Sequence, residues 1–136
     1  MNPMEPALSG VTLHLMYFGI AIIALGVFIA VYTAVTPYWE IRLIREGNTA
    51  AAISLGGAIL GYCCPLAQSV AQSGNLTDML LWSVVALVAQ LAAYGVTRLL
   101  LPHLATDINT GKIAPSIFLA ALSIGIGILN AAAMSE

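Results

Sequence analysis

The amino-acid sequence predicts an all-α integral membrane protein with four transmembrane helices, and two observations carry this prediction. The chain has 136 residues, of which 60% are apolar and only 7% are charged, whereas a soluble domain is about 25% charged. The apolar residues form four long stretches, and about 20 helical residues cross a bilayer. We therefore expect residues 1–136 to form a single membrane domain. The same composition excludes a free soluble enzyme and a nucleic-acid-binding protein.

Each apolar stretch is long enough to cross the membrane as one helix. The expected helices are, in order, Val11–Val35, Thr49–Ser73, Leu76–Leu101 and Ile113–Met134. Only Asp78 and Arg98 lie inside a stretch, and both are close to its ends. Strands of a membrane barrel would alternate polar and apolar residues, which these runs do not. Asn75 or Thr77 is expected to cap the third helix.

The basic residues predict how the chain is oriented. All of them lie in or beside the two loops Thr36–Asn48 and Pro102–Lys112, and the N-terminal tail, the turn Gly74–Asn75 and the C-terminus contain none. Basic loops stay on the cytoplasmic side of a membrane. We therefore expect both loops inside and both termini outside.

Aromatic and basic side chains near the helix ends are expected at the membrane interface. Trp prefers the level of the headgroups, and Arg extends toward them along its own aliphatic stem. Membrane lipids are therefore expected partners. The predicted interface residues are Trp39, Trp82, Arg42, Arg45 and Arg98.

The two halves of the chain resemble each other. An offset of 64 residues aligns the second expected helix with the fourth, so that Ala50 meets Ala114 and Gly61 meets Gly125. Both hairpins would then run in the same direction, as a parallel repeat. Repeat one would cover about 11–73 and repeat two about 76–134. The alternative is that helices rich in small residues look alike through composition alone.

Small residues at helical spacing predict close packing. The second helix contains Gly57-x-x-x-Gly61, and the fourth contains Ala121-x-x-x-Gly125 followed by Gly127. Lipid tails are as apolar as leucine, so membrane helices gain from close backbone approach over small residues. These residues either pack the second helix against the fourth or hold a partner subunit, which would make the protein a homo-oligomer.

Polar residues inside the expected helices form a second set of candidates. Gln90 and Tyr94 lie on the third helix, Gln68 on the second and Asn130 on the fourth. An intramembrane polar group needs a partner and often has a function. These residues either bond helices together or line a polar pathway. Pro65 is expected to kink the second helix beside the amide side chains.

Catalytic and metal-binding patterns are not found. His14 and His103 would lie on opposite sides of the membrane. Cys63 and Cys64 are adjacent, so they point about 100° apart around a helix, which suits neither a disulfide nor a zinc site. We expect no cofactor, no metal and no enzymatic activity.

Several short motifs resemble one known family. They are Thr36-Pro37, the run Gly47-Asn48-Thr49-Ala50-Ala51-Ala52, Pro65-Leu66, and Gly127-Ile128-Leu129-Asn130-Ala131-Ala132. Together they resemble the YjfL-like family of small bacterial inner-membrane proteins. The resemblance implies a multi-pass protein of the bacterial inner membrane, made from two copies of a domain of unknown function. Family members tend to be encoded near phage-shock-type membrane-remodelling proteins, which implies such proteins as partners and a link to membrane stress.

Two functions remain open from the sequence. The leading hypothesis is a non-enzymatic envelope component that acts through protein or lipid partners under membrane stress. The alternative is a small channel or transporter, with a polar pathway between the second, third and fourth helices.

The distribution of basic residues gives a direct test of orientation. A reporter fused after Glu136 should give the signal of an external location, and one inserted within Pro102–Lys112 the signal of a cytoplasmic location. Paired alkaline phosphatase and fluorescent-protein fusions measure this in intact cells. The reverse pattern would show that both loops face outward.

Overall fold

The chain folds as a bundle of α-helices, and four of them are long and apolar enough to cross a membrane. A computed structural model describes residues 5–72 and 75–134. Within these residues, all regular structure is helical, as predicted. The helices are α1 (Glu5–Val35), α2 (Glu40–Arg45), α3 (Thr49–Gln72), α4 (Leu76–Leu100), α5 (Leu104–Asn109) and α6 (Ile113–Met134). Ser73 and Gly74, part of the predicted second helix and turn, lie outside the described residues.

Asparagine side chains cap the N-termini of two of the long helices. The Asn75 side chain accepts a hydrogen bond from the Asp78 backbone N–H at 2.8 Å, which confirms it as the cap of α4. The Asn48 carbonyl oxygen Oδ1 accepts from Ala51 N–H at 3.0 Å at the start of α3. Both caps satisfy N–H groups that the first turn of a helix leaves free.

The polar loops contain two short helices that the sequence analysis did not predict. α2 and α5 each have six residues, too few to show an apolar repeat over a sequence window. Tertiary contacts stabilise them, because Leu104 and Ile108 of α5 are fully buried one turn apart. Short helices generally depend on such packing rather than on their own propensity.

The two loops share one backbone shape. Gly47 follows α2 with φ +86°, and Gly111 follows α5 with φ +84°, a conformation that glycine adopts at no steric cost. The Asn48 side-chain amide also donates to the carbonyl oxygen of Ile108 at 2.7 Å and so joins the two loops. The predicted duplication remains a prediction about how the chain arose.

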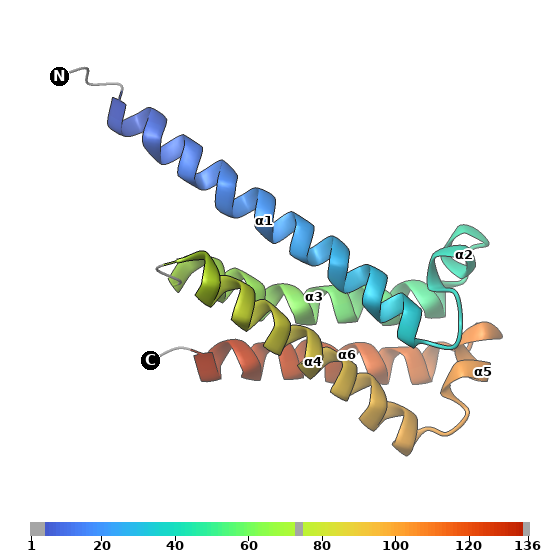
Figure 1. The fold of residues 1–136 in the computed structure, drawn as a ribbon. Helices are drawn as coiled ribbons and strands as arrows, with labels where there is room; N and C mark the ends of the chain where they lie inside the picture. The colour runs from blue at the N-terminus through green and yellow to red at the C-terminus, as the bar shows by residue number, and fades with distance from the viewer. Residues whose placement is uncertain (1–4, 73–74, 135–136) are drawn as a thin grey trace.

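α3 is the central helix, with α6 as its most extensive neighbour and α4 next. α2 and α5 lie together at one end of the bundle, and α1 begins and α6 ends at the other (Figure 1). We call these the loop end and the terminal end. The first half of α1 leans away from the rest of the bundle (Figure 1). The only buried residues of the whole helix, Phe28 and Tyr32, lie in its second half.

Glycines allow α3 and α6 to touch through their backbones. A Cβ atom added to Gly57 would collide with Ala120, and one added to Gly61 would collide with the carbonyl group of Ser123. A Cβ atom added to Gly127 would collide with the Gly61 carbonyl. The two helices therefore approach too closely for any larger residue at these three glycines.

The contact at Gly127 coincides with a break in the hydrogen bonding of α3. Pro65 lies inside α3 and has no N–H to donate to the carbonyl group one turn earlier, at Gly61. The Cα–H bond of Gly127 that another residue would replace with Cβ points at that carbonyl oxygen. A Cα–H group can partly satisfy such an oxygen through a weak hydrogen bond. The absence of a side chain at Gly127 thus serves both packing and hydrogen bonding.

The close contact uses a face of α6 next to the predicted Ala121–Gly125 pair. Ala121 is exposed, and a Cβ atom added to Gly125 would meet nothing within 4 Å. Ala120, Ser123 and Gly127 face α3 instead. Neighbouring helix positions point about 100° apart, so a shift of one residue moves the contact to another face.

The difference between Gly127 and Gly125 yields a matched pair of variants. Gly127→Ala should destabilise the bundle by roughly 1–3 kcal/mol, because the added methyl group collides with backbone atoms that cannot move aside. Gly125→Ala makes the same chemical change on the same helix with free space around it. Thermal melting of both variants in detergent measures the effect. Equal melting temperatures would show that α3 and α6 are not in backbone contact at Gly127.

Candidate functional site

Gln90 forms a buried hydrogen bond between two membrane-spanning helices. The residue lies on α4 and is fully buried. Its amide Nε2 donates to the backbone carbonyl oxygen of Ser123 on α6 at 3.0 Å. A Cβ atom at Gly61 would come within 2.7 Å of the same nitrogen, so Gln90 lies against the α3–α6 contact. Its side-chain oxygen Oε1 is buried without a hydrogen-bond partner.

The other predicted pathway residues are spread along the bundle. Tyr94 is buried one turn beyond Gln90, and its ring lies against Tyr32 with a centroid distance of 5.9 Å. Gln68 and Asn130 are partly buried near the ends of their helices at the terminal end. The amide Nδ2 of Asn130 is buried without a hydrogen-bond partner. The structure thus places Tyr94 toward the loop end and the two amides toward the terminal end.

Gln68 lines a polar hollow at the terminal end. The hollow has a volume of about 610 Å³. Its lining residues are Gln68, Ser69, Gln72, Asp78, Leu81, Trp82 and Met134. It is the place where polar side chains of α3 and α4 face a shared space.

A buried carboxylate at the loop end was not among the sequence-based candidates. Glu40 begins α2 and has an exposed fraction of 0%. Its oxygen Oε1 accepts a hydrogen bond from the Thr36 hydroxyl at 2.5 Å. Its second oxygen, Oε2, is buried without a hydrogen-bond partner. A buried carboxylate normally has several partners, so this arrangement is unusual.

Three tyrosines gather with Glu40. The hydroxyl groups of Tyr32, Tyr38 and Tyr94 are all buried without a hydrogen-bond partner. The ring of Tyr94 lies 5.9 Å from that of Tyr32 and 6.5 Å from that of Tyr38. Glu40 lies near enough to interact electrostatically with all three hydroxyls. We call Thr36, Glu40 and these tyrosines the carboxyl–tyrosine cluster.

Burial is the largest influence on the pKa values of Glu40 and Tyr38, the two titratable members of the cluster that lie outside the spanning helices. It raises the pKa of Glu40 above its ordinary value, and hydrogen bonds from the Thr36 hydroxyl and from the backbone N–H of Glu40 only partly oppose this rise. Burial also raises the pKa of Tyr38, with further increases from Tyr94, Tyr32 and Glu40 nearby. Loss of water disfavours the charged form of each group, so both are driven toward neutrality.

The cluster has a weak signal in the sequence. Glu40 stands in a charged loop with two arginines, where an acidic residue normally faces water. The Thr36-x-x-x-Glu40 spacing and the flanking tyrosines Tyr32 and Tyr38 were available as clues. They become a cluster only because the chain turns back on itself between α1 and α2.

Most of the predicted interface residues lie on the surface. Trp39 is exposed beside α2, whereas Trp82 is half-buried in the lining of the polar hollow. Arg42 forms an ion pair with Glu46 at 3.2 Å. Arg45 and Arg98 are exposed.

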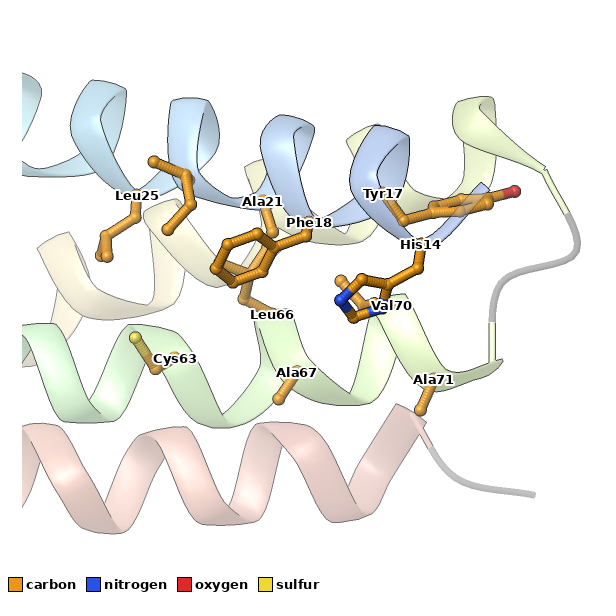
Figure 2. Close-up of a pocket in the computed structure, with 11 residues that line it drawn as sticks. His14, Tyr17, Phe18, Ala21, Leu25, Cys63, Leu66, Ala67, Val70 and Ala71 are labelled. Carbon is orange, nitrogen blue, oxygen red and sulfur yellow. The ribbon is translucent and has the colours of Figure 1, made fainter. Parts of the chain in front are cut away.

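An apolar groove separates the first half of α1 from α3 (Figure 2). Its volume is about 360 Å³, and His14, Phe18 and Leu25 of α1 face Cys63 and Val70 of α3 across it. A second apolar groove, of about 260 Å³, lies between α1 and α4. Both exist because α1 leans away from the bundle.

Within the residues 5–72 and 75–134, no three His, Cys, Asp or Glu side chains come together as a metal site. His14 and His103 are both exposed, and Cys63 and Cys64 are free and partly buried. The absence of cofactors and of enzymatic activity stays an expectation from the sequence.

Four apolar helices long enough to span a bilayer define a multi-pass α-helical membrane protein. Residues 6–134 match the family described as Domain of Unknown Function (DUF350), and the chain belongs to this family.

Two bacterial relatives support the assignment over most of the chain. The chain is 34% identical to the UPF0719 inner membrane protein YjfL of Escherichia coli (strain K12) over 119 residues, 88% of this chain and 90% of the relative. It is 30% identical to the UPF0719 transmembrane protein YshE of Bacillus subtilis (strain 168) over 118 residues, 85% of this chain and 88% of the relative. No solved structure matches. The protein is therefore a multi-pass protein of the bacterial inner membrane, as the resemblance implied.

Substitution of Gln90 distinguishes a bond between helices from a polar pathway. Gln90→Leu removes the bond to Ser123 but also removes an unpartnered buried oxygen, so the loss should be near the membrane average of about 0.6 kcal/mol. Thermal melting in detergent measures it, with Gln72→Leu in the exposed last turn of α3 as the control. A Gln90→Leu protein that melts normally yet loses an ion or solute flux would favour the pathway instead.

Proposed function

We propose that the protein is a non-enzymatic component of the inner membrane that acts through partners within the bilayer. The partner we favour is a second copy of the chain, held along α1. The main observation behind this proposal is the position of α1, which leans away from the bundle and leaves apolar grooves on two sides. Such hollows in a membrane are filled by lipid tails or by apolar side chains, since interiors pack densely.

The character of the α1 surface supports lateral contact. Large apolar side chains are exposed along most of its length, from Leu8 to Val27, and Gly10, Gly19 and Gly26 have no neighbouring atom within 4 Å of an added Cβ. Small residues on a membrane helix allow another helix to approach closely. The suggested association with membrane stress and with phage-shock-type proteins rests on the family resemblance.

One observation favours the alternative of a channel or transporter. The polar hollow at the terminal end could form the mouth of a pathway between α3 and α4. Against this, Gln90 bonds to Ser123, and the glycine contacts close α3 against α6 near mid-membrane. Purified protein in liposomes with an imposed ion gradient separates the two functions, because only a channel or transporter would dissipate it.

Oxidative cross-linking tests self-association through α1. In a Cys63→Ala, Cys64→Ala background, Ile23→Cys should give a disulfide-linked dimer in membranes, because Ile23 lies on α1 with 67% exposure. Leu129→Cys is a matched control, since Leu129 on α6 has a similar exposure of 69%. Non-reducing electrophoresis measures the dimer. Equal cross-linking at both positions, or none at either, would contradict association through α1.

A further inference from the structure

The carboxyl group of Glu40 in the carboxyl–tyrosine cluster has no basic side chain paired with it in the described residues. Two ion pairs occur in the described part of the chain, Arg42 with Glu46 and Lys112 with Asp107, and neither includes Glu40. An isolated carboxylate in a low-dielectric site is so costly that such a group normally binds a proton or a cation instead. No side chain in the described residues supplies that positive charge to Glu40 as an ion pair.

Each element around Glu40 supplies neutral groups. α1 supplies the Tyr32 hydroxyl, the α1–α2 connection supplies Thr36 and Tyr38, and α4 supplies Tyr94. Arg98, one turn beyond Tyr94, is exposed and interacts electrostatically with the Tyr94 hydroxyl, but it forms no ion pair with Glu40. α3, which packs against α2, has no acidic or basic residue, and its Tyr62 stacks on Phe28. The basic residues of α2 itself are exposed.

Hydrogen-bond directions around Thr36 favour a proton over a metal cation. The single Thr36 hydroxyl proton has three acceptors within reach: the carbonyl oxygens of Thr33 and Tyr38, each at 3.2 Å, and Glu40 Oε1 at 2.5 Å. One hydroxyl cannot satisfy all of them. If Glu40 carries the proton, it donates to the Thr36 oxygen, and the Thr36 hydroxyl is free to donate to a backbone carbonyl.

The cluster also holds α1 to the rest of the protein. Tyr32, one of the two buried residues of α1, belongs to it, and the other, Phe28, stacks on Tyr62 at 4.3 Å. A negative charge on Glu40 would therefore appear beside Tyr32, one of the residues through which α1 packs against the bundle. Deprotonation would draw in water and weaken that attachment.

We propose that the Glu40 carboxyl is a proton-binding site, which holds a proton at neutral pH and thereby keeps α1 attached to the bundle. The ligand is the proton itself, bound at the end of the bundle where α1, α2 and α4 meet. This site is independent of self-association, because every group in it belongs to one chain.

Infrared spectroscopy tests the proton directly. Full-length protein labelled with carbon-13 glutamate in lipid nanodiscs should show a protonated-carboxyl stretch at pH 7. Glu40→Gln should abolish this band, whereas Glu46→Gln, which changes an exposed glutamate of the same loop, should leave it unchanged. The band should persist to pH 7, where a glutamate with its ordinary pKa of ~4.3 is ionised. If the band were absent at pH 7, or were lost in parallel with the exposed carboxyls, Glu40 would not be a proton site.

A second measurement tests the link to the fold without depending on the labelled band. A pKa that is higher in the folded protein than in the unfolded one makes stability greatest at low pH, and this stability is lost as pH rises through the folded-state pKa. The melting temperature of the wild type should therefore fall with rising pH, and that of Glu40→Gln should fall less, since glutamine cannot lose a proton. Glu46→Gln should follow the wild type. A wild-type melting temperature that depends on sodium or potassium concentration at fixed pH, lost in Glu40→Gln, would show a metal cation in place of the proton.

Discussion

The backbone contact between α3 and α6 is the constraint on which the rest of the structure depends. In a membrane the hydrophobic effect does not drive helices together, so the bundle relies on close packing and on hydrogen bonds. Gly57, Gly61 and Gly127 bring the two backbones together, and the Gly61 carbonyl left free by Pro65 lies within this contact. Gln90 bonds to α6 beside it. These contacts make α3 the centre of the molecule.

The same contact explains why α1 packs against the bundle over only part of its length. α3 uses its glycine face for α6 and packs also with α4. α1 meets the bundle only through its second half, by an aromatic stack, the carboxyl–tyrosine cluster and a few partly buried apolar side chains. Its remaining length borders apolar grooves. The two proposals thus concern opposite ends of one helix: lateral partners along its free half, and a proton at its attached end. A helix anchored at one end is suited to respond to changes at that anchor.

The four spanning helices and the Asn75 cap were predictable because they depend on local properties of the chain. Span length follows from bilayer thickness and helical rise, and the cap depends on one side chain and the next turn. α2 and α5 were missed, since six-residue helices are stabilised by burial against other elements. The close approach of α3 and α6 was predicted as one alternative from Gly57 and Gly61, but the face of α6 involved was not, because the small residues Ala120 to Gly127 occur on more than one face.

By itself, the sequence determined that this is a four-helix membrane protein of the DUF350 family, because hydrophobic length, small-residue motifs and family motifs are properties of the linear chain. Only the tertiary structure decided that Ala121 and Gly125 lie beside the contact and that Gln90 bonds to Ser123. It also decided that Glu40, in a loop rich in charges, is withdrawn from water among tyrosines from α1 and α4. The physical reason is that the burial of a side chain depends on what the distant parts of the chain place around it, and no local pattern records that.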